Sequence, residues 1–161
     1  MIAMAVREPV RVHLGGCMKH ELEAVREVMC ELRSRNEAVA RFPTNAYVFA
    51  VELLNKIQGK LRSDNADIDC RELANEVPWF ALEQFGLMAG HVLSYFKIRT
   101  EADFGRLVEN LVIAELFAFG SDESRNKFRP EVDYSFLDRA KVNPDWQTGN
   151  DEEWRYIFPT Q

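Results

Sequence analysis

The chain has 161 residues, 47% of them apolar, and carries 20 Lys and Arg against 26 Asp and Glu, a net charge of −6. This size and composition predict one domain with a proper hydrophobic core. The negative charge repels phosphate backbones and anionic headgroups, so nucleic acid and membrane surfaces are disfavoured as partners. No apolar run approaches the roughly 20 residues of a membrane span.

The cysteines and histidines form no recognisable metal or redox motif. Cys17, Cys30 and Cys70 lack the close pairs of a zinc site or a redox dithiol. None of the three histidines stands at a spacing from a cysteine that would close a metal site. We therefore expect no metal, no cofactor, and free thiols in a reducing cytoplasm.

Residues 1–17 show no clear periodicity and end just after Gly15-Gly16. One interpretation is an N-terminal arm that is unordered or loosely strand-like. The other, which we favour, is that translation begins at Met18 rather than Met1. A purine-rich ribosome-binding sequence read in frame gives Gly-Gly shortly before a methionine.

Apolar residues spaced three and four positions apart predict five amphipathic helices. They cover residues 19–39, 45–61, 70–85 and 87–96 and a last segment that opens at Thr100. Beyond that segment, residues 116–119 and 125–128 suit two strands, although an irregular loop with a short helical turn remains open. The predicted fold is mainly α, a compact bundle of about five helices. A small C-terminal β-hairpin would give it a winged-helix-like outline.

The helix boundaries carry local chemical signals. Thr44, Asp69 and Thr100 are the expected N-caps, because a short polar side chain accepts a hydrogen bond from a free amide of the first turn. Gly86 is expected to end the third helix in the left-handed conformation. Pro78 lies within that helix and is expected to kink or split it.

The helical domain is predicted over residues 18–140 and an aromatic, polar tail over residues 141–161. The aromatic residues of the tail are Trp146, Trp154, Tyr156 and Phe158. Purely disordered linkers are poor in aromatic residues. The tail is therefore expected either to dock on its own domain or to be a peptide offered to a partner.

Four motifs follow one another along the chain: AYVF at 46–49, LEQFG at 82–86, DFGRLVENLV at 103–112, and ESRNKF at 123–128. In this order and spacing they resemble an uncharacterised family of short bacterial proteins, best known from the planctomycete and verrucomicrobial group. The resemblance covers about residues 36–137 and implies no activity, cofactor or catalytic residue. Leu87 stands where the family tends to have proline, and residues 115–117 stand where it tends to have Gly-Leu-Leu.

Some residues suggest metal binding or catalysis, but structural roles explain them better. Asp103-Phe104-Gly105 spells the magnesium-binding triplet of protein kinases, but the chain has no glycine-rich phosphate loop and no HRD segment. We interpret it as a coincidence, with Phe104 in the core and Gly105 permitting close packing. His91 has no acid at a neighbouring helical step to orient it as a general base, so a satisfied structural histidine is favoured.

Three further polar residues are expected to stabilise the fold. Glu83 and Gln84, beside the glycine turn, are expected to satisfy free backbone groups there, with one of the two half-buried. Arg125 is expected to reach back to Glu101 or Asp103 and so tie the following segment to the last helix.

The leading functional prediction is a non-enzymatic protein-interaction or regulatory module. Its candidate interaction residues are the acidic side chains of the last helix and two tail tryptophans: Glu101, Asp103, Glu109, Glu115, Trp146 and Trp154. One alternative is a winged-helix-like, nucleic-acid-associated regulator that uses Lys56, Lys60 and Arg62. A third is an enzyme with a pocket around Glu83 and His91.

Overall fold

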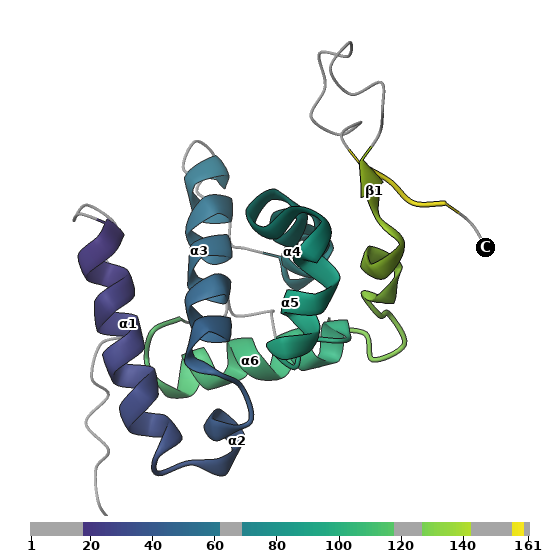
Figure 1. Cartoon of the computed structure of the whole chain (residues 1–161). Helices are drawn as coiled ribbons and strands as arrows, with labels where there is room; N and C mark the ends of the chain where they lie inside the picture. Colours follow the sequence, from purple (N-terminus) through teal and green to yellow (C-terminus); the bar gives the residue numbers. More distant parts are fainter. Residues whose placement is uncertain (1–17, 62–68, 118–126, 143–155, 160–161) are drawn as a thin grey trace, which may run out of the picture.

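Helices make up most of the described part of the chain. The computed structural model describes residues 18–61, 69–117, 127–142 and 156–159 (Figure 1). Its α-helices are α1 (Met18–Arg33), α2 (Glu37–Ala40), α3 (Thr44–Leu61), α4 (Cys70–Phe85), α5 (Ala89–Tyr95) and α6 (Glu101–Ile113). The other elements are the 3₁₀-helices η1 (Gly86–Met88) and η3 (Ser135–Arg139) and the strands β1 (Lys141–Val142) and β2 (Tyr156–Ile157). The predicted mainly α fold is confirmed.

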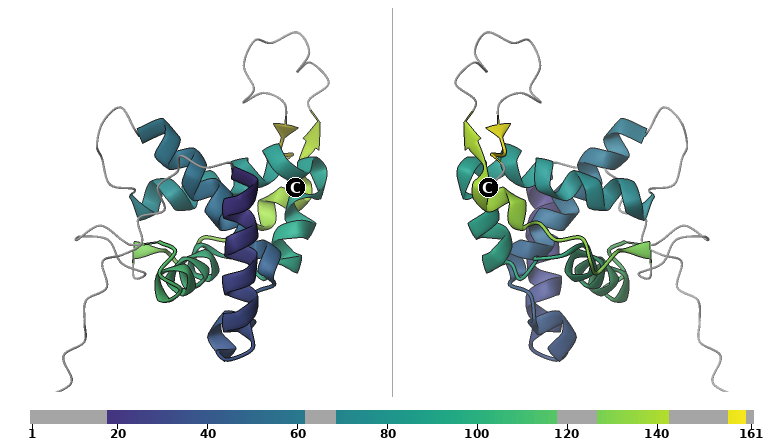
Figure 2. Two further views of the ribbon diagram at one scale, coloured as in Figure 1. Left: turned by 90° about the vertical axis from the view of Figure 1, so that its left-hand side faces the viewer. Right: turned by 90° about the vertical axis from the view of Figure 1, so that its right-hand side faces the viewer.

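The helices form a bundle that α6 crosses. Figure 1 shows α1 and α3 upright side by side, with α6 running across the lower ends of α3 and α5. α4 packs on α3, and α5 packs on α4 and on η3. Figure 2 shows α1 facing the viewer from one side and η3 with β1 from the other, so these segments lie on opposite sides of the domain.

The small C-terminal sheet is not where the sequence placed a hairpin. β1 pairs antiparallel with β2, so that Lys141 lies opposite Ile157 and Val142 opposite Tyr156. The described ends of the predicted hairpin, residues 116–117 and 127–128, are not in strands, and residues 118–126 lie outside the described part of the chain.

The chain after α6 has a different role. Glu115 adopts a left-handed conformation (φ 59°), and the amide of Leu116 donates to the carbonyl of Leu111 (2.9 Å). This reversal closes the helix in the manner of a Schellman turn. It brings Leu116 and Phe117 against the core, where they are partly buried. Apolar residues that suggested a strand therefore serve to terminate a helix.

The first predicted helix is also divided. α1 ends at Arg33, and Asn36 starts the short α2 by accepting hydrogen bonds from the amides of Ala38 (3.0 Å) and Val39 (3.4 Å). A continuous helix over residues 19–39 was the wrong prediction, because the asparagine side chain competes for these amides and favours a cap. The break lets Val39 become fully buried.

Most other boundary predictions are confirmed. Asp69 caps α4 through the amide of Arg71 (2.9 Å), and Gly86 ends α4 with φ 56°. Thr100 caps α6. α4 continues through Pro78, which excludes a split of the helix there, one of the two predicted effects of this proline. Thr44 is instead the first residue of α3, and its hydroxyl accepts a hydrogen bond from Arg33 (3.4 Å).

A buried hydrogen-bond network joins α2, α3 and α6. The hydroxyl of Tyr47 donates to the carbonyl of Val39 (2.7 Å) and accepts from the side-chain amide of Asn110 (3.0 Å), which also donates to the carbonyl of Ala38 (3.0 Å). Burial raises the pKa of Tyr47 to about 12, although the hydrogen bond from Asn110 acts in the opposite direction. The network ties two carbonyls of α2 to side chains of α3 and α6.

Gly105 permits the close packing expected of it. A Cβ placed there would lie 2.7 Å from the ring of Phe128, which itself packs edge-on against Phe104 (6.2 Å between centroids). We expect Gly105→Ala to lower the free energy of unfolding by about 1–3 kcal/mol, because overpacking exceeds alanine's helix preference of about 1 kcal/mol. Urea denaturation gives the value.

The matched control is Gly59→Ala in α3, where a Cβ would meet nothing within 4 Å. It should leave stability unchanged or raise it by up to about 1 kcal/mol. A stabilising Gly105→Ala would show that Phe128 moves aside without cost.

Candidate interaction surface

Three large apolar side chains are exposed along η1 and α5. Leu87, Met88 and Tyr95, here called the apolar strip, have exposed fractions of 51%, 56% and 66%. Residues 88 and 95 lie two turns apart on one face of the helix. On the opposite face, Ala89 and Leu93 are buried. The positive φ of Gly86 reverses the chain between α4 and α5 and so decides which face packs inward.

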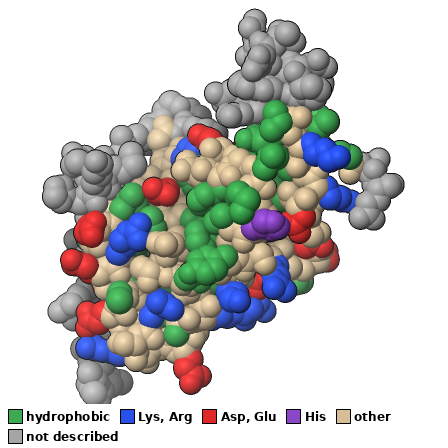
Figure 3. Space-filling view, in the orientation of Figure 1, with side chains coloured by type: hydrophobic (Ala, Val, Ile, Leu, Met, Phe, Trp, Pro, Cys, Tyr) green, Lys and Arg blue, Asp and Glu red, His purple; other side chains and the backbone are tan. Residues whose placement is uncertain are grey.

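The surroundings of the apolar strip include exposed basic residues. His91 lies on the exposed side of α5, and Lys97 and Arg99 are exposed just beyond its end. Figure 3 shows hydrophobic side chains gathered on this face, with a histidine beside them and several Lys and Arg side chains below. His91 is therefore a surface residue rather than the satisfied structural histidine that the sequence favoured.

Glu101, expected on an exposed acidic face of α6, is buried instead, with an exposed fraction of 1%. Its carboxylate accepts hydrogen bonds from the amide (3.0 Å), Nε (3.2 Å) and Nη2 (2.8 Å) of Arg129. Burial alone would raise the pKa of Glu101, but the hydrogen bonds and charge of Arg129 outweigh burial and lower it. Glu101 thus fastens the segment after α6 to the start of that helix.

Asp103 is also buried, with an exposed fraction of 8%. One carboxylate oxygen accepts from the amides of Arg99 (3.1 Å) and Thr100 (3.2 Å), which completes a capping box with Thr100. The other accepts from Arg106 (3.0 Å) and Arg41 (3.3 Å). These contacts position the start of α6, and the prediction that Glu101 and Asp103 are surface residues is wrong.

The other predicted interaction residues are distributed differently. Glu109 is half-buried and Glu115 is exposed. Trp146, Trp154 and Arg125 lie outside the described residues. Arg129, four positions after Arg125, makes the kind of contact with Glu101 that was predicted for Arg125.

Glu83 and Gln84 are both exposed, so neither is half-buried at the glycine turn as was expected of one of them. Glu83 forms an ion pair with Lys56, whose ammonium also lies 5.3 Å from the ring centre of Phe80. Lys56, one of three residues proposed for nucleic-acid binding, is therefore already engaged by a carboxylate. The side chain of Lys60 and all of Arg62 lie outside the described part.

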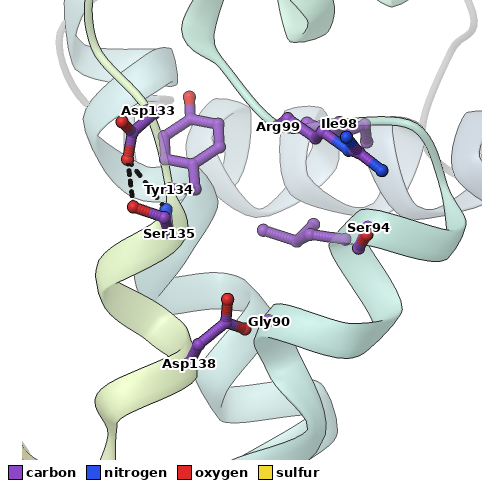
Figure 4. Close-up of a pocket in the computed structure, with 9 residues that line it drawn as sticks. Gly90, Ser94, Ile98, Arg99, Asp133, Tyr134, Ser135 and Asp138 are labelled. Carbon is purple, nitrogen blue, oxygen red and sulfur yellow. Dashed lines mark hydrogen bonds between the residues drawn. The ribbon is translucent and has the colours of Figure 1, made fainter.

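A pocket of about 360 Å³ lies between α5 and η3 (Figure 4). Leu93 and Ile98 supply its buried apolar lining. Its polar lining comes from Ser94, Arg99, Asp133, Ser135 and Asp138. Neither Glu83 nor His91 lines it, so the two residues suggested for an enzyme do not meet there.

The polar groups of this pocket serve the local turn. Asp133 accepts hydrogen bonds from the amide (3.0 Å) and hydroxyl (2.6 Å) of Ser135, and these bonds lower the pKa of Asp133. Figure 4 shows the Asp138 side chain directed toward Gly90. A Cβ on Gly90 would collide with that carboxylate and lie 3.2 Å from the amide of Asp138, so α5 and η3 approach closely. No nucleophile with an oriented base is formed by these lining residues.

Within residues 18–61, 69–117, 127–142 and 156–159, no three His, Cys, Asp or Glu side chains are grouped so that they could share a metal ion. The helices described there include none with the length and apolar content that a bilayer span requires.

Comparisons with protein-family models, with curated proteins and with solved structures found no match to this chain. The resemblance to the planctomycete and verrucomicrobial family thus stays a prediction.

Proposed function

We propose that this protein is a non-enzymatic protein-interaction module that binds its partner through the apolar strip. The supporting observation is the exposure of Leu87, Met88 and Tyr95 along η1 and α5. Isolated exposed apolar residues are ordinary, but large ones grouped on one face mark interaction sites. Methionine and tyrosine are also enriched at interfaces, methionine because it adapts its shape and tyrosine because one end is apolar and the other polar.

The charges beside the apolar strip define the partner's chemistry. Lys97 and Arg99 are exposed where α5 ends. A partner segment with apolar anchors flanked by Asp or Glu would be complementary to this surface, whereas basic segments would be repelled. The acidic face predicted for α6 would instead have required a basic partner. That face is incomplete, because Glu101 and Asp103 are buried.

The test is a comparison of three forms of the full chain as bait in an extract of its native source. Wild type is compared with Met88→Ser/Tyr95→Ser and with Ile113→Ser, which removes an equally exposed apolar side chain on α6. We expect the same bound proteins with wild type and Ile113→Ser, and at least a tenfold loss with the double variant. Thermal melts should show both variants within about 0.5 kcal/mol of wild type, because the replaced side chains are exposed.

The bound proteins are then purified and titrated against the same three forms at two salt concentrations. Affinity that falls with salt supports an acidic partner. Equal recovery on all three baits would show that the apolar strip is not the binding surface, and the proposal would be abandoned.

A further inference from the structure

The C-terminal residues 156–159 pack on the domain beside α4, η1 and η3. The ring of Phe158 contacts Trp79 of α4 (5.9 Å between centroids, edge-on) and Phe136 of η3 (5.3 Å, edge-on). The hydroxyl of Tyr156 lies 3.5 Å from the position that a Cβ on Gly86 would occupy. Tyr156 and Phe158 are both partly buried against the core.

The spacing of these contacts is that of an extended strand. Tyr156 and Phe158 are two residues apart, so they face the same side of the strand, toward the domain. Ile157 between them is exposed, and the backbone pairs with β1 through Lys141 and Val142. The domain thus provides the edge of strand β1, the backbone at Gly86, and the rings of Trp79 and Phe136, which are here called the aromatic slot.

The packing of residues 156–159 on the domain is only weakly stabilised. β1 and β2 contain two residues each, and an isolated two-stranded pair is marginal at best in water. Each edge-on ring contact adds about 0.5–1.5 kcal/mol beyond the area that it buries. Trp79 retains an exposed fraction of 49% although Phe158 lies against it, so the slot has apolar surface left for a larger ligand.

We propose that β1, Gly86, Trp79 and Phe136 form a binding site for an extended aromatic-X-aromatic peptide, which the chain's own Tyr156-Ile157-Phe158 occupies in cis. A partner segment of this pattern adds to β1 as a strand and replaces β2, the mode of recognition called β-augmentation. The chain's own segment is the competitor that sets how tightly such a partner must bind. A tethered competitor acts at an effective concentration in the millimolar range. This inference does not rest on the proposed function: β1, Trp79 and Phe136 are not part of the apolar strip, although Gly86 precedes Leu87 of the strip.

The test is a titration of the full chain into a fluorescein-labelled peptide of residues 155–161, followed by fluorescence anisotropy. Phe158→Ser empties the aromatic slot of the protein, and this variant is expected to bind the labelled peptide at least tenfold more tightly than wild type does. Adding Trp79→Ser to that variant is expected to weaken binding at least tenfold, and so is replacing the phenylalanine of the peptide by serine. An affinity that does not change between wild type and Phe158→Ser, or that survives Trp79→Ser, overturns the proposal.

A second measurement needs no variant and uses the folded wild-type chain. Unlabelled peptide is added to millimolar excess while the backbone N–H resonance of Ile157 in the ¹⁵N-labelled chain is followed by NMR. We expect this resonance to shift in a saturable manner, because the peptide takes the place of the chain's own β2 against β1. A resonance that stays fixed over the whole titration overturns the proposal. The serine-substituted peptide is the control and should leave the resonance unchanged.

Discussion

The Phe49→Ala variant is expected to lose about 3–5 kcal/mol of stability, the range found when a buried aromatic side chain is truncated. Phe49 is almost completely buried in α3. Its ring contacts those of Phe80 (5.2 Å), Phe85 (5.9 Å) and Phe96 (5.9 Å), so it joins α3 to α4 and to the end of α5. The loss is a large part of the 5–15 kcal/mol typical of a whole domain. Urea denaturation monitored by circular dichroism measures it.

Tyr95→Ala is the matched control, because it removes a ring of similar size that is exposed on α5. It should change stability by no more than about 0.5 kcal/mol. If both alanine variants lost the same amount, the contact between Phe49 and the three other rings would not be the centre of the core.

Glu101→Ala is expected to lower the free energy of unfolding by about 3 kcal/mol, near the lower end of the range for breaking a buried ion pair. It removes three hydrogen bonds from Arg129, including one from its backbone amide. The loss stays near the lower end because the Arg129 side chain retains some contact with water. Denaturant unfolding at pH 7 measures it, and Glu83→Gln, which breaks an exposed pair with Lys56, should cost no more than about 1 kcal/mol.

The stability contributed by the ion pair of Glu101 and Arg129 depends on pH. The folded-state pKa of Glu101 is lowered, so the unfolded chain takes up a proton at a higher pH than the folded chain does. The stabilising contribution is therefore complete above the usual glutamate pKa of about 4.3 and disappears as pH falls through the lowered folded-state value. Melting temperatures from pH 7 to pH 3 should fall less steeply for Glu101→Gln than for wild type. Parallel curves would show that this carboxylate does not contribute to acid unfolding.

Two predictions about α6 were wrong, because Glu101 and Asp103 are buried and not exposed. Glu101 and Asp103 stand in the first turn of an amphipathic helix, where carboxylates normally face solvent and favour the positive end of the helix dipole. Their burial depends on Arg129 and Arg41, which are 28 and 62 residues away along the chain. No local pattern predicts such partners. The exposure of Leu87 and Met88 could not be predicted either, because helix periodicity does not show which other elements will cover a given face of a helix.

The features that could be predicted from the sequence are the mainly α fold, the Asp69 and Thr100 caps, and the end of α4 at Gly86. Each depends on interactions between nearby positions or on the conformational freedom of one residue. The burial of Glu101 and Asp103, the exposure of the apolar strip and the packing of Phe158 against Trp79 and Phe136 follow only from the folded structure. These depend on contacts between segments that are distant in sequence, whose geometry is set when the whole core packs.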